Sequence, residues 1–315
     1  MIVYAVNIHT GGGKVLLDAL IVDQPFGSIT KVYADSRYVA PENKPAGVEV
    51  VAVKPTLYNR FFAEIKMYKD QGYSQANEIL FFGNLPPLFR PFFGLNKNKK
   101  FILYLQNAFL ILSFSYPKNS FKELVRLSVE KLWLHLFNFN INEIWVQTPW
   151  MKAQTLLSLG ADKTIKVAPF LPTLPVTEKS TVKKYKFLYV GSLAKHKGLE
   201  TFLKALQELD KKITTKISVC VVLDSASQNV DLGHFKNIDI KLFTSANRED
   251  LFNIYKDSEY LVCTSRLESF YLPIYEAHHF GCAIILPANA SYSANLPASI
   301  NAKTYTAPNL DLIGF

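Results

Sequence analysis

The chain contains little of what marks secreted or metal-binding proteins. It has only three cysteines in 315 residues, and their spacing is not that of a metal site. Cys220 and Cys263 lie in apolar runs typical of buried strands, so together with Cys282 they are expected to be reduced core thiols. Met1 leads into an apolar segment without a basic stretch, so no secretory signal peptide is expected. These absences predict a cytoplasmic protein.

Long apolar runs and dense charge are missing as well. The longest apolar stretch, residues 101–116, is interrupted by Gln106, Asn107 and Ser113. It is shorter than the about 20 residues that cross a bilayer as a helix, so no transmembrane segment is expected. Charged residues make up 19% of the chain and apolar residues 49%, which excludes an intrinsically disordered protein. The sequence therefore predicts a folded chain with a large core.

Acidic residues are outnumbered by basic ones, and the net charge is +9. The basic residues are scattered in small groups without a helix-turn-helix, zinc-finger or RNP pattern, so we expect no nucleic acid partner. Diffuse positive charge fits a phosphate-bearing substrate, peripheral contact with the anionic inner face of the cytoplasmic membrane, or a merely solvated surface. Charge alone leaves these three interpretations open.

Short runs rich in Val, Ile, Tyr and Phe alternate with longer amphipathic stretches, which is typical of βα units on a parallel sheet. Strands are predicted at residues 2–7, 29–33, 48–53, 79–83, 101–105, 143–147, 164–168, 186–191, 216–222, 238–243, 260–263 and 283–286. Helical spacing is present in residues 120–137, 199–209, 247–257 and 272–281. The apolar stripe of segment 120–137 is expected to pack in the core rather than to anchor a membrane; it consists of Phe121, Leu124, Val125, Leu132, Leu136 and Phe137.

The length of the chain exceeds that of one hydrophobic core, which favours two domains. Pro169, Pro172 and Pro175 cannot donate hydrogen bonds to a sheet and favour extended backbone, so they predict a linker. The alternating pattern restarts after them. We therefore expect an α/β fold of two Rossmann-like domains, residues 1–172 and 173–315.

A glycine-rich turn follows the first predicted strand. Gly11, Gly12 and Gly13 stand immediately before Lys14 and an apolar segment with helical character. Glycines at such a turn let backbone N–H groups approach an anion at the helix N-terminus. The pattern is neither the GxxxxGK[ST] P-loop nor GxGxxG, so it predicts either a phosphate contact or only a tight turn.

A second strand end enters a helix at residues 190–200, VGSLAKHKGLE. Lys197 is placed where its ammonium would meet a diphosphate beside the helix N-terminus, and Ser192 would add a hydroxyl donor. By itself, such a lysine is equally an ordinary surface residue.

The third motif is the sharpest and spans residues 265–287. Glu268 follows the strand YLVCT, and Pro273 suits the first turn of a new helix, so Glu276 falls within that helix. Two carboxylates at a loop-to-helix corner can each accept paired hydrogen bonds from vicinal hydroxyls of a ribose or hexose. The alternative is two ordinary exposed glutamates.

The segment from Glu268 to Ala277, preceded by Thr264-Ser265 and followed by Gly281-Cys-Ala-Ile-Ile, resembles the E-x7-E region of retaining glycosyltransferases of family 4. This family is also called group 1 and has the GT-B fold, in which two Rossmann-like domains face each other across a cleft. The resemblance extends to residues 145–157, 190–198 and 247–262 and to the glycine turn, so it covers nearly the whole chain.

The resemblance implies a metal-independent transferase that takes a nucleotide-sugar donor. Glu276 would bind the ribose hydroxyls, Glu268 the donor sugar, and Lys197 the diphosphate as it departs in a front-face displacement with retention. Backbone N–H groups of four residues would lie beside the sugar and diphosphate: Ser269, Phe270, Tyr271 and Leu272. Gly11, Gly12, Gly13 and Ser192 would complete the donor contacts. The absence of any D-x-D triplet fits metal independence.

Several positions depart from the family pattern. Gly191-Ser192 stands where relatives often carry Gly-Arg, so one guanidinium for the phosphates is missing. Ser269 and Tyr271 replace glycines of the frequent E-G-F-G-L, which predicts bulk where bare backbone often meets the sugar. The second domain is expected to be short, because many relatives continue beyond the point where this chain ends. His9, His278 and His279 are expected to pack or cap helices rather than catalyse.

The resemblance, aided by the positive charge, implies transfer of a hexose from a UDP- or GDP-sugar to a glycan or lipid-linked acceptor, in the synthesis of a bacterial surface polysaccharide such as O-antigen or capsule. The first domain is the expected acceptor side. A catalytically silent protein that binds nucleotide-sugars or glycans is the alternative. A nicotinamide-dependent oxidoreductase shares the βα pattern but would need GxGxxG with a following acidic residue, which the chain lacks.

Overall fold

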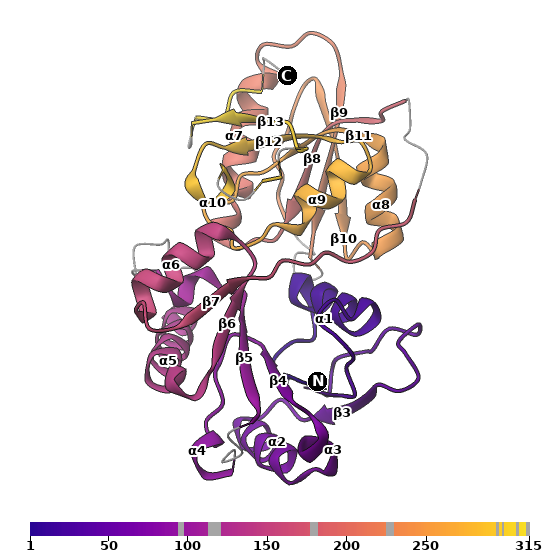
Figure 1. Ribbon diagram of the computed structural model, residues 1–315. Helices are drawn as coiled ribbons and strands as arrows, with labels where there is room; N and C mark the ends of the chain where they lie inside the picture. The colour runs from indigo at the N-terminus through magenta and orange to yellow at the C-terminus, as the bar shows by residue number, and fades with distance from the viewer. Residues whose placement is uncertain are drawn as a thin grey trace. The chain divides into compact units, whose positions relative to one another are not determined.

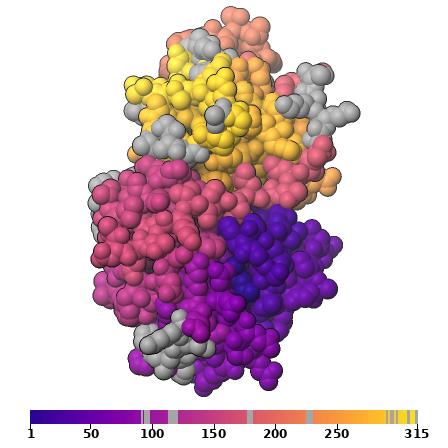
Figure 2. Space-filling view, viewed as in Figure 1, coloured from indigo at the N-terminus to yellow at the C-terminus, as the bar shows by residue number. Residues whose placement is uncertain are grey.

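The computed structural model describes residues 1–93, 98–112, 121–176, 182–224, 230–293, 296–297, 299–306 and 309–312. These residues form two compact units, the first up to Thr173 and the second from Leu174 (Figures 1 and 2). Part of the predicted linker, residues 177–181, lies outside the described residues.

The first unit is built on a seven-stranded parallel sheet in the order β3-β2-β1-β4-β5-β6-β7 (Figure 1). Its strands are β1 (Ile2–Ala5), β2 (Lys31–Asp35), β3 (Glu49–Val53), β4 (Glu78–Phe82), β5 (Lys100–Leu105), β6 (Glu143–Val146) and β7 (Thr164–Val167). Its helices are α1 (Gly11–Asp23), α2 (Leu57–Lys69), α3 (Gln71–Gln75), α4 (Arg90–Phe93), η1 (Ala108–Leu110), α5 (Phe121–Phe137), η2 (Asn138–Asn140) and α6 (Pro149–Leu159). The strand order reverses between β1 and β4, which are hydrogen-bonded neighbours.

The second unit repeats this order in a six-stranded parallel sheet, β10-β9-β8-β11-β12-β13. Its strands are β8 (Tyr185–Gly191), β9 (Ile217–Leu223), β10 (Ile238–Thr244), β11 (Ser258–Val262), β12 (Ala283–Pro287) and β13 (Ala302–Tyr305). Its helices are η3 (Lys195–Lys197), α7 (Leu199–Asp210), α8 (Arg248–Asp257), α9 (Leu272–His279) and α10 (Ala290–Ser293). The reversal here lies between β8 and β11. Both units therefore have the doubly wound order of nucleotide-binding sheets, as the sequence predicts.

Alternating side chains of the second sheet feed two separate cores. Leu188 packs in a cluster with residues of α8 and α9, whereas Phe187 and Tyr189 pack against α7. Figure 1 shows the same layers, with α7 on one face of the sheet and α8 and α9 on the other. The three cysteines are free thiols buried in these layers, as expected. No helix in the described part of the chain is long and apolar enough to cross a membrane.

Helix α5 contradicts one prediction. Its apolar stripe was expected in the core, but Phe121 is 82% exposed and Leu132 is 59% exposed. Val125 and Leu136 are also exposed, Leu124 and Phe137 are half-buried, and Leu134 is the buried residue of this helix. Helical spacing identified the helix correctly, but it does not say which of two apolar faces the sheet covers.

Asp35 ends β2 with a carboxylate that is fully buried. Arg37 holds it through two bonds of 2.8 Å, from Nε to Oδ1 and from the guanidinium NH2 to Oδ2. These bonds lower the pKa of Asp35 to about 2. A carboxyl group whose pKa is lower in the folded than in the unfolded chain stabilises the fold when the pH is above its pKa in the unfolded chain. This stabilisation is lost as the pH falls through its pKa in the folded chain.

Asp35→Asn is therefore expected to reduce the free energy of unfolding by about 2 kcal/mol near neutral pH. The difference from the unmodified chain should shrink as the pH falls from about 4 to about 2, because the carboxyl group then takes up its proton. Urea unfolding of both proteins across this range measures it. A difference that does not change with pH would contradict the assigned pKa.

Candidate functional site

The three sequence motifs lie at the carboxyl ends of strands, where parallel sheets of this order bind ligands. Lys197 follows β8 and Glu268 follows β11, the two strands at the reversal point of the second sheet. Lys197 Nζ lies 2.7 Å from Glu268 Oε1, and the two side chains are 24% and 11% exposed. The structure thus joins two predicted site residues that are 71 positions apart.

Gly198 explains how these two loops come so close. It adopts φ +73°, and a Cβ atom added there would lie 2.3 Å from the backbone oxygen of Thr264. The hydroxyl of Thr264 donates a 3.0 Å hydrogen bond to the backbone oxygen of Lys197. Only glycine therefore allows the loop of Lys197 to pack against the end of β11.

Gly198→Ala is expected to lower the free energy of unfolding by roughly 2 kcal/mol or more, because it adds a steric clash to an unfavourable φ. Chemical denaturation measures this loss. Gly233→Ala is a matched control, since its φ is +82° but a Cβ atom there would make only contacts of 3.8 Å or more. Equal losses in the two variants would mean that the contact with Thr264 is not what requires glycine.

The side chain of Tyr271 does not add bulk to the surface of its loop, contrary to the expectation from the sequence. Its side chain is turned into the unit and is 8% exposed, with its hydroxyl donating to the backbone oxygen of Val190. The ammonium of Lys197 lies 5.5 Å from the centre of its ring. Burial raises the pKa of Tyr271, so the hydroxyl stays a donor. The ring therefore fixes the loops instead of filling the surface between them.

The other residues of the second unit that were predicted to contact the nucleotide-sugar donor lie just before or at the N-terminus of a helix. Leu272 begins α9, and Ser269 and Phe270 precede it, with the ring of Phe270 stacked on Tyr275 at 4.7 Å. Ser192 follows β8, and its Oγ accepts a 3.4 Å bond from the N–H of Ala194.

The glycine turn starts a helix of the first unit. Gly11, Gly12 and Gly13 form the first turn of α1, and Gly11 has φ +64°. A Cβ atom at Gly11 would meet no atom within 4 Å, so the space beside this turn is open. The indigo segment that contains α1 reaches the surface in Figure 2.

Glu276 is not an ordinary exposed helix residue. It is 2% exposed. Its Oε1 lies 2.6 Å from a guanidinium nitrogen of Arg248, and its Oε2 accepts a 3.1 Å bond from the hydroxyl of Tyr255. Burial, together with the charge of Glu276, raises the pKa of Tyr255 and keeps that hydroxyl protonated. A buried carboxylate is thus held in one orientation by two donors.

Arg248 and Tyr255 are site residues that the sequence motifs did not identify. They lie on α8 seven positions apart, which places them on one face of the helix. The guanidinium of Arg248 also lies over the ring of Phe252 at 4.6 Å. The signal was present as an Arg and a Tyr two turns apart, but nothing in the spacing names Glu276 as their partner.

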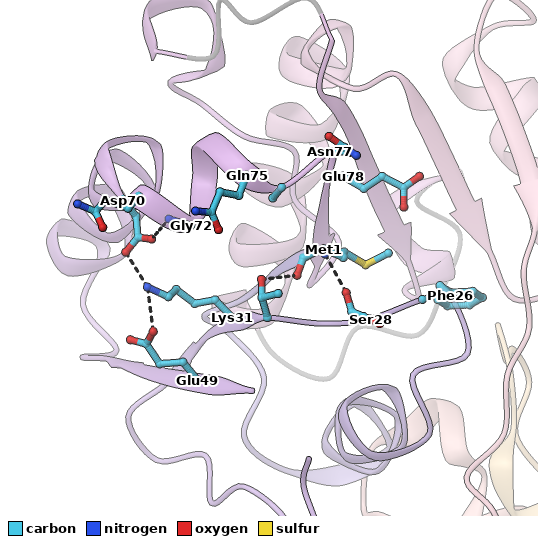
Figure 3. Close-up of a pocket in the computed structure, with 14 residues that line it drawn as sticks. Met1, Phe26, Ser28, Lys31, Glu49, Asp70, Gly72, Gln75, Asn77 and Glu78 are labelled. Carbon is cyan, nitrogen blue, oxygen red and sulfur yellow. Dashed lines mark hydrogen bonds and ion pairs between the residues drawn. The ribbon is translucent and has the colours of Figure 1, made fainter. Parts of the chain in front are cut away.

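A hollow of about 950 Å³ lies elsewhere, at the amino ends of β1, β2 and β4 (Figure 3). Lys31 crosses it and pairs with Asp70 at 2.7 Å and Glu49 at 3.0 Å. The amino group of Met1 donates to the backbone oxygen of Ser28 at 2.8 Å. Lys31 and its two carboxylates thus pair with one another, and the amino group of Met1 is held by a backbone oxygen, so these groups form a structural network rather than being aimed at a ligand.

Comparisons with known proteins agree with the fold. The chain is similar to sucrose-phosphate synthase from Thermosynechococcus elongatus, with 16% identity over 91% of this chain and 80% of that one and a TM-score of 0.61. It is similar to HepE from Anabaena, in complex with UDP and glucose, with 13% identity over 98% and 86% of the chains and a TM-score of 0.62. It is also similar to WaaG, a glycosyltransferase involved in lipopolysaccharide biosynthesis, with 14% identity over 93% of this chain and 82% of that one and a TM-score of 0.58.

These similarities show that the chain has the GT-B fold class, as predicted. The sequence of residues 173–294 matches the family described as glycosyl transferases group 1. The matched segment contains Lys197, Arg248, Glu268 and Glu276 and ends in the second unit. A search of curated protein sequences found no match. The second unit is therefore similar to group 1 glycosyl transferases, which agrees with the resemblance of its motifs.

Proposed function

We propose that the protein transfers a hexose from a UDP- or GDP-sugar to a glycan or lipid-linked acceptor, with retention of configuration. The observation that carries this proposal is the pairing of Lys197 with Glu268 at the reversal point of the second sheet, within the segment that matches group 1 glycosyl transferases. The neighbouring carboxylate of Glu276 supplies a buried, oriented acceptor for hydroxyl groups. The complex of HepE with UDP and glucose supports the class of donor.

In this proposal Glu276 accepts hydrogen bonds from the ribose hydroxyls, while Arg248 and Tyr255 keep its oxygens in place. A carboxylate has about four lone-pair positions, so two remain after these donors are counted. Glu268 accepts bonds from the hydroxyls of the donor sugar. The backbone N–H groups from Ser269 to Leu272, at the start of α9, face the diphosphate and favour its negative charge.

Lys197 carries the chemical step. As the bond between the sugar carbon and the diphosphate oxygen breaks, the ammonium stabilises the charge that develops on that oxygen. The acceptor oxygen bonds to the sugar carbon on the same face, and its proton passes to the departing diphosphate. The three donors of an ammonium allow Lys197 to keep Glu268 while it binds phosphate. We propose that these groups act without a metal ion, which the lack of a D-x-D triplet supports.

The first unit takes the acceptor, and we propose that the product belongs to a bacterial surface polysaccharide made in the cytoplasm at the inner membrane face. The exposed apolar stripe of α5 supports contact with that surface. The glycine turn at α1 offers backbone N–H groups to a phosphate oxygen.

The test is a panel of UDP- and GDP-sugars given to the purified chain, with release of nucleotide as the readout and NMR of the product for its configuration. Glu276→Ala should remove the activity. Unchanged turnover in this variant would refute the site. Donor binding without turnover on any acceptor would instead identify a silent binding protein.

A further inference from the structure

A small cavity in the first unit has no role in the proposed donor chemistry. Its volume is about 80 Å³, and residues on both sides of the β1–β4 boundary line it. Tyr4 and Phe81 come from these strands, Phe61 from α2 and Trp133 from α5. This is the reversal point of the first sheet, the position that Lys197 and Glu268 occupy in the second.

Most of the cavity wall is apolar, although Asn7, Arg60 and Glu64 also line it. The rings of Phe61 and Trp133 stack with their centres 5.6 Å apart. The indole N–H of Trp133 donates to the backbone oxygen of Pro86 at 3.0 Å, so its polar atom is already satisfied. The cavity therefore offers carbon surface held in one geometry, which suits an apolar group.

Arg60 lines the same cavity together with Glu64, and its guanidinium is paired with the carboxylate of Asp35. Asp35 accepts two hydrogen bonds of 2.8 Å from Arg37, whereas its contact with Arg60 is longer, at 3.4 Å, and therefore weaker. Glu64 accepts bonds from the N–H groups of Leu88 and Phe89 and from the hydroxyl of Tyr68.

The Nε atom of Arg60 is buried and has no hydrogen-bond partner among the described residues. Leaving such a donor unsatisfied costs about 1–3 kcal/mol, and an anion is the partner that recovers it best.

Apolar surface continues from the cavity along α2. Leu57 lines the cavity and is 68% exposed, and its neighbour Tyr58 is 66% exposed. The ring of Tyr58 lies 4.3 Å from that of Phe62, which is 44% exposed. The first turns of α2 thus present an unusual group of large apolar side chains to solvent beside Arg60, whose Nε atom has no partner among the described residues.

We propose that this cavity and Arg60 bind a lipid phosphate, with the apolar chain along α2 and in the cavity and the phosphate on the guanidinium. The inference rests on the proposed function and names the class of its acceptor: a lipid-linked one, recognised through its phosphate. An acceptor without an anionic group would leave the Nε donor of Arg60 without a charged partner.

The test is binding of farnesyl phosphate to the full chain by calorimetry. Saturable binding is expected, at least about 10-fold tighter than that of farnesol or of inorganic phosphate, since each lacks one half of the recognised group. Arg60→Met should weaken it about 10-fold or more. The matched control is Arg126→Met, which removes a 61% exposed arginine of the same unit that does not line the cavity.

Leu57→Asp keeps the test decisive if Arg60→Met fails to fold, because it changes an exposed position and places a negative charge beside the chain. This variant should also bind farnesyl phosphate about 10-fold more weakly. Equal affinity in the unmodified chain and in a folded Arg60→Met variant would overturn the proposal, as would equal binding of farnesol. Affinity for UDP or GDP is measured in parallel and should be unchanged, so failure at the donor site is seen separately.

Discussion

Lys197→Met is expected to lower kcat for sugar transfer about 100- to 1000-fold with little change in KM for the donor. The ammonium acts on charge that develops as the diphosphate departs, and removal of one such donor in an active site typically has this effect. Steady-state kinetics with the preferred donor measures it. Lys204→Met is the matched control, because this exposed lysine of α7 pairs with Glu200 on the same helix face.

The variant also leaves Glu268, which is 11% exposed, without its cation. A loss of activity could then reflect lost folding, so the double variant Lys197→Met with Glu268→Gln is the second measurement. It should regain the thermal stability of the unmodified chain and remain inactive. Recovery of turnover in the double variant would show that Lys197 serves only to neutralise Glu268.

Glu276→Gln is expected to weaken binding of UDP or GDP about 10- to 100-fold, whichever of the two the unmodified chain prefers. The reason is that hydrogen bonds from ribose hydroxyls to a charged acceptor are worth about 1.5–3 kcal/mol. Calorimetry measures the change. Glu249→Gln is the control, since it removes a neighbouring exposed carboxylate in the first turn of α8.

Arg248→Met, alone and combined with Glu276→Gln, tests whether Arg248 serves to orient Glu276 for the nucleotide or only to stabilise the fold. It removes the cation from the carboxylate of Glu276, which is 2% exposed. It should therefore lower the free energy of unfolding by about 1–3 kcal/mol and also weaken binding of the nucleotide. Adding Glu276→Gln should restore stability but not binding. If the double variant binds nucleotide like the unmodified chain, Glu276 does not contact the ribose.

The sequence predicted the sheets well because most strands are short buried runs of Val, Ile, Leu and aromatic residues, which leave little doubt about strand type. It missed β13, whose four residues Ala302–Tyr305 contain a single buried side chain. It also missed α2, whose aromatic residues obscure helical spacing, and α6 (Pro149–Leu159). The direction of the α5 stripe could not be predicted, because burial depends on what packs against a helix.

The candidate site also has features that the sequence predicted and features that it did not. Lys197 and Glu268 were both predicted to lie in the donor site, but their contact was not, because it depends on β8 and β11 being neighbours in the sheet. The contact of Arg248 and Tyr255 with Glu276 could not be predicted either, because it depends on how α8 packs against α9. The inward turn of Tyr271 was equally hidden: sequence shows the size of a side chain but not its direction.

The bond from Thr264 to the backbone of Lys197, together with the close approach of Gly198, couples the two loops mechanically. A ligand that immobilises either loop must slow the opening of both, because neither can leave without breaking the shared contact. Amide exchange should therefore become slower over residues 192–198 and 264–271 together when nucleotide binds, as a single cooperative segment.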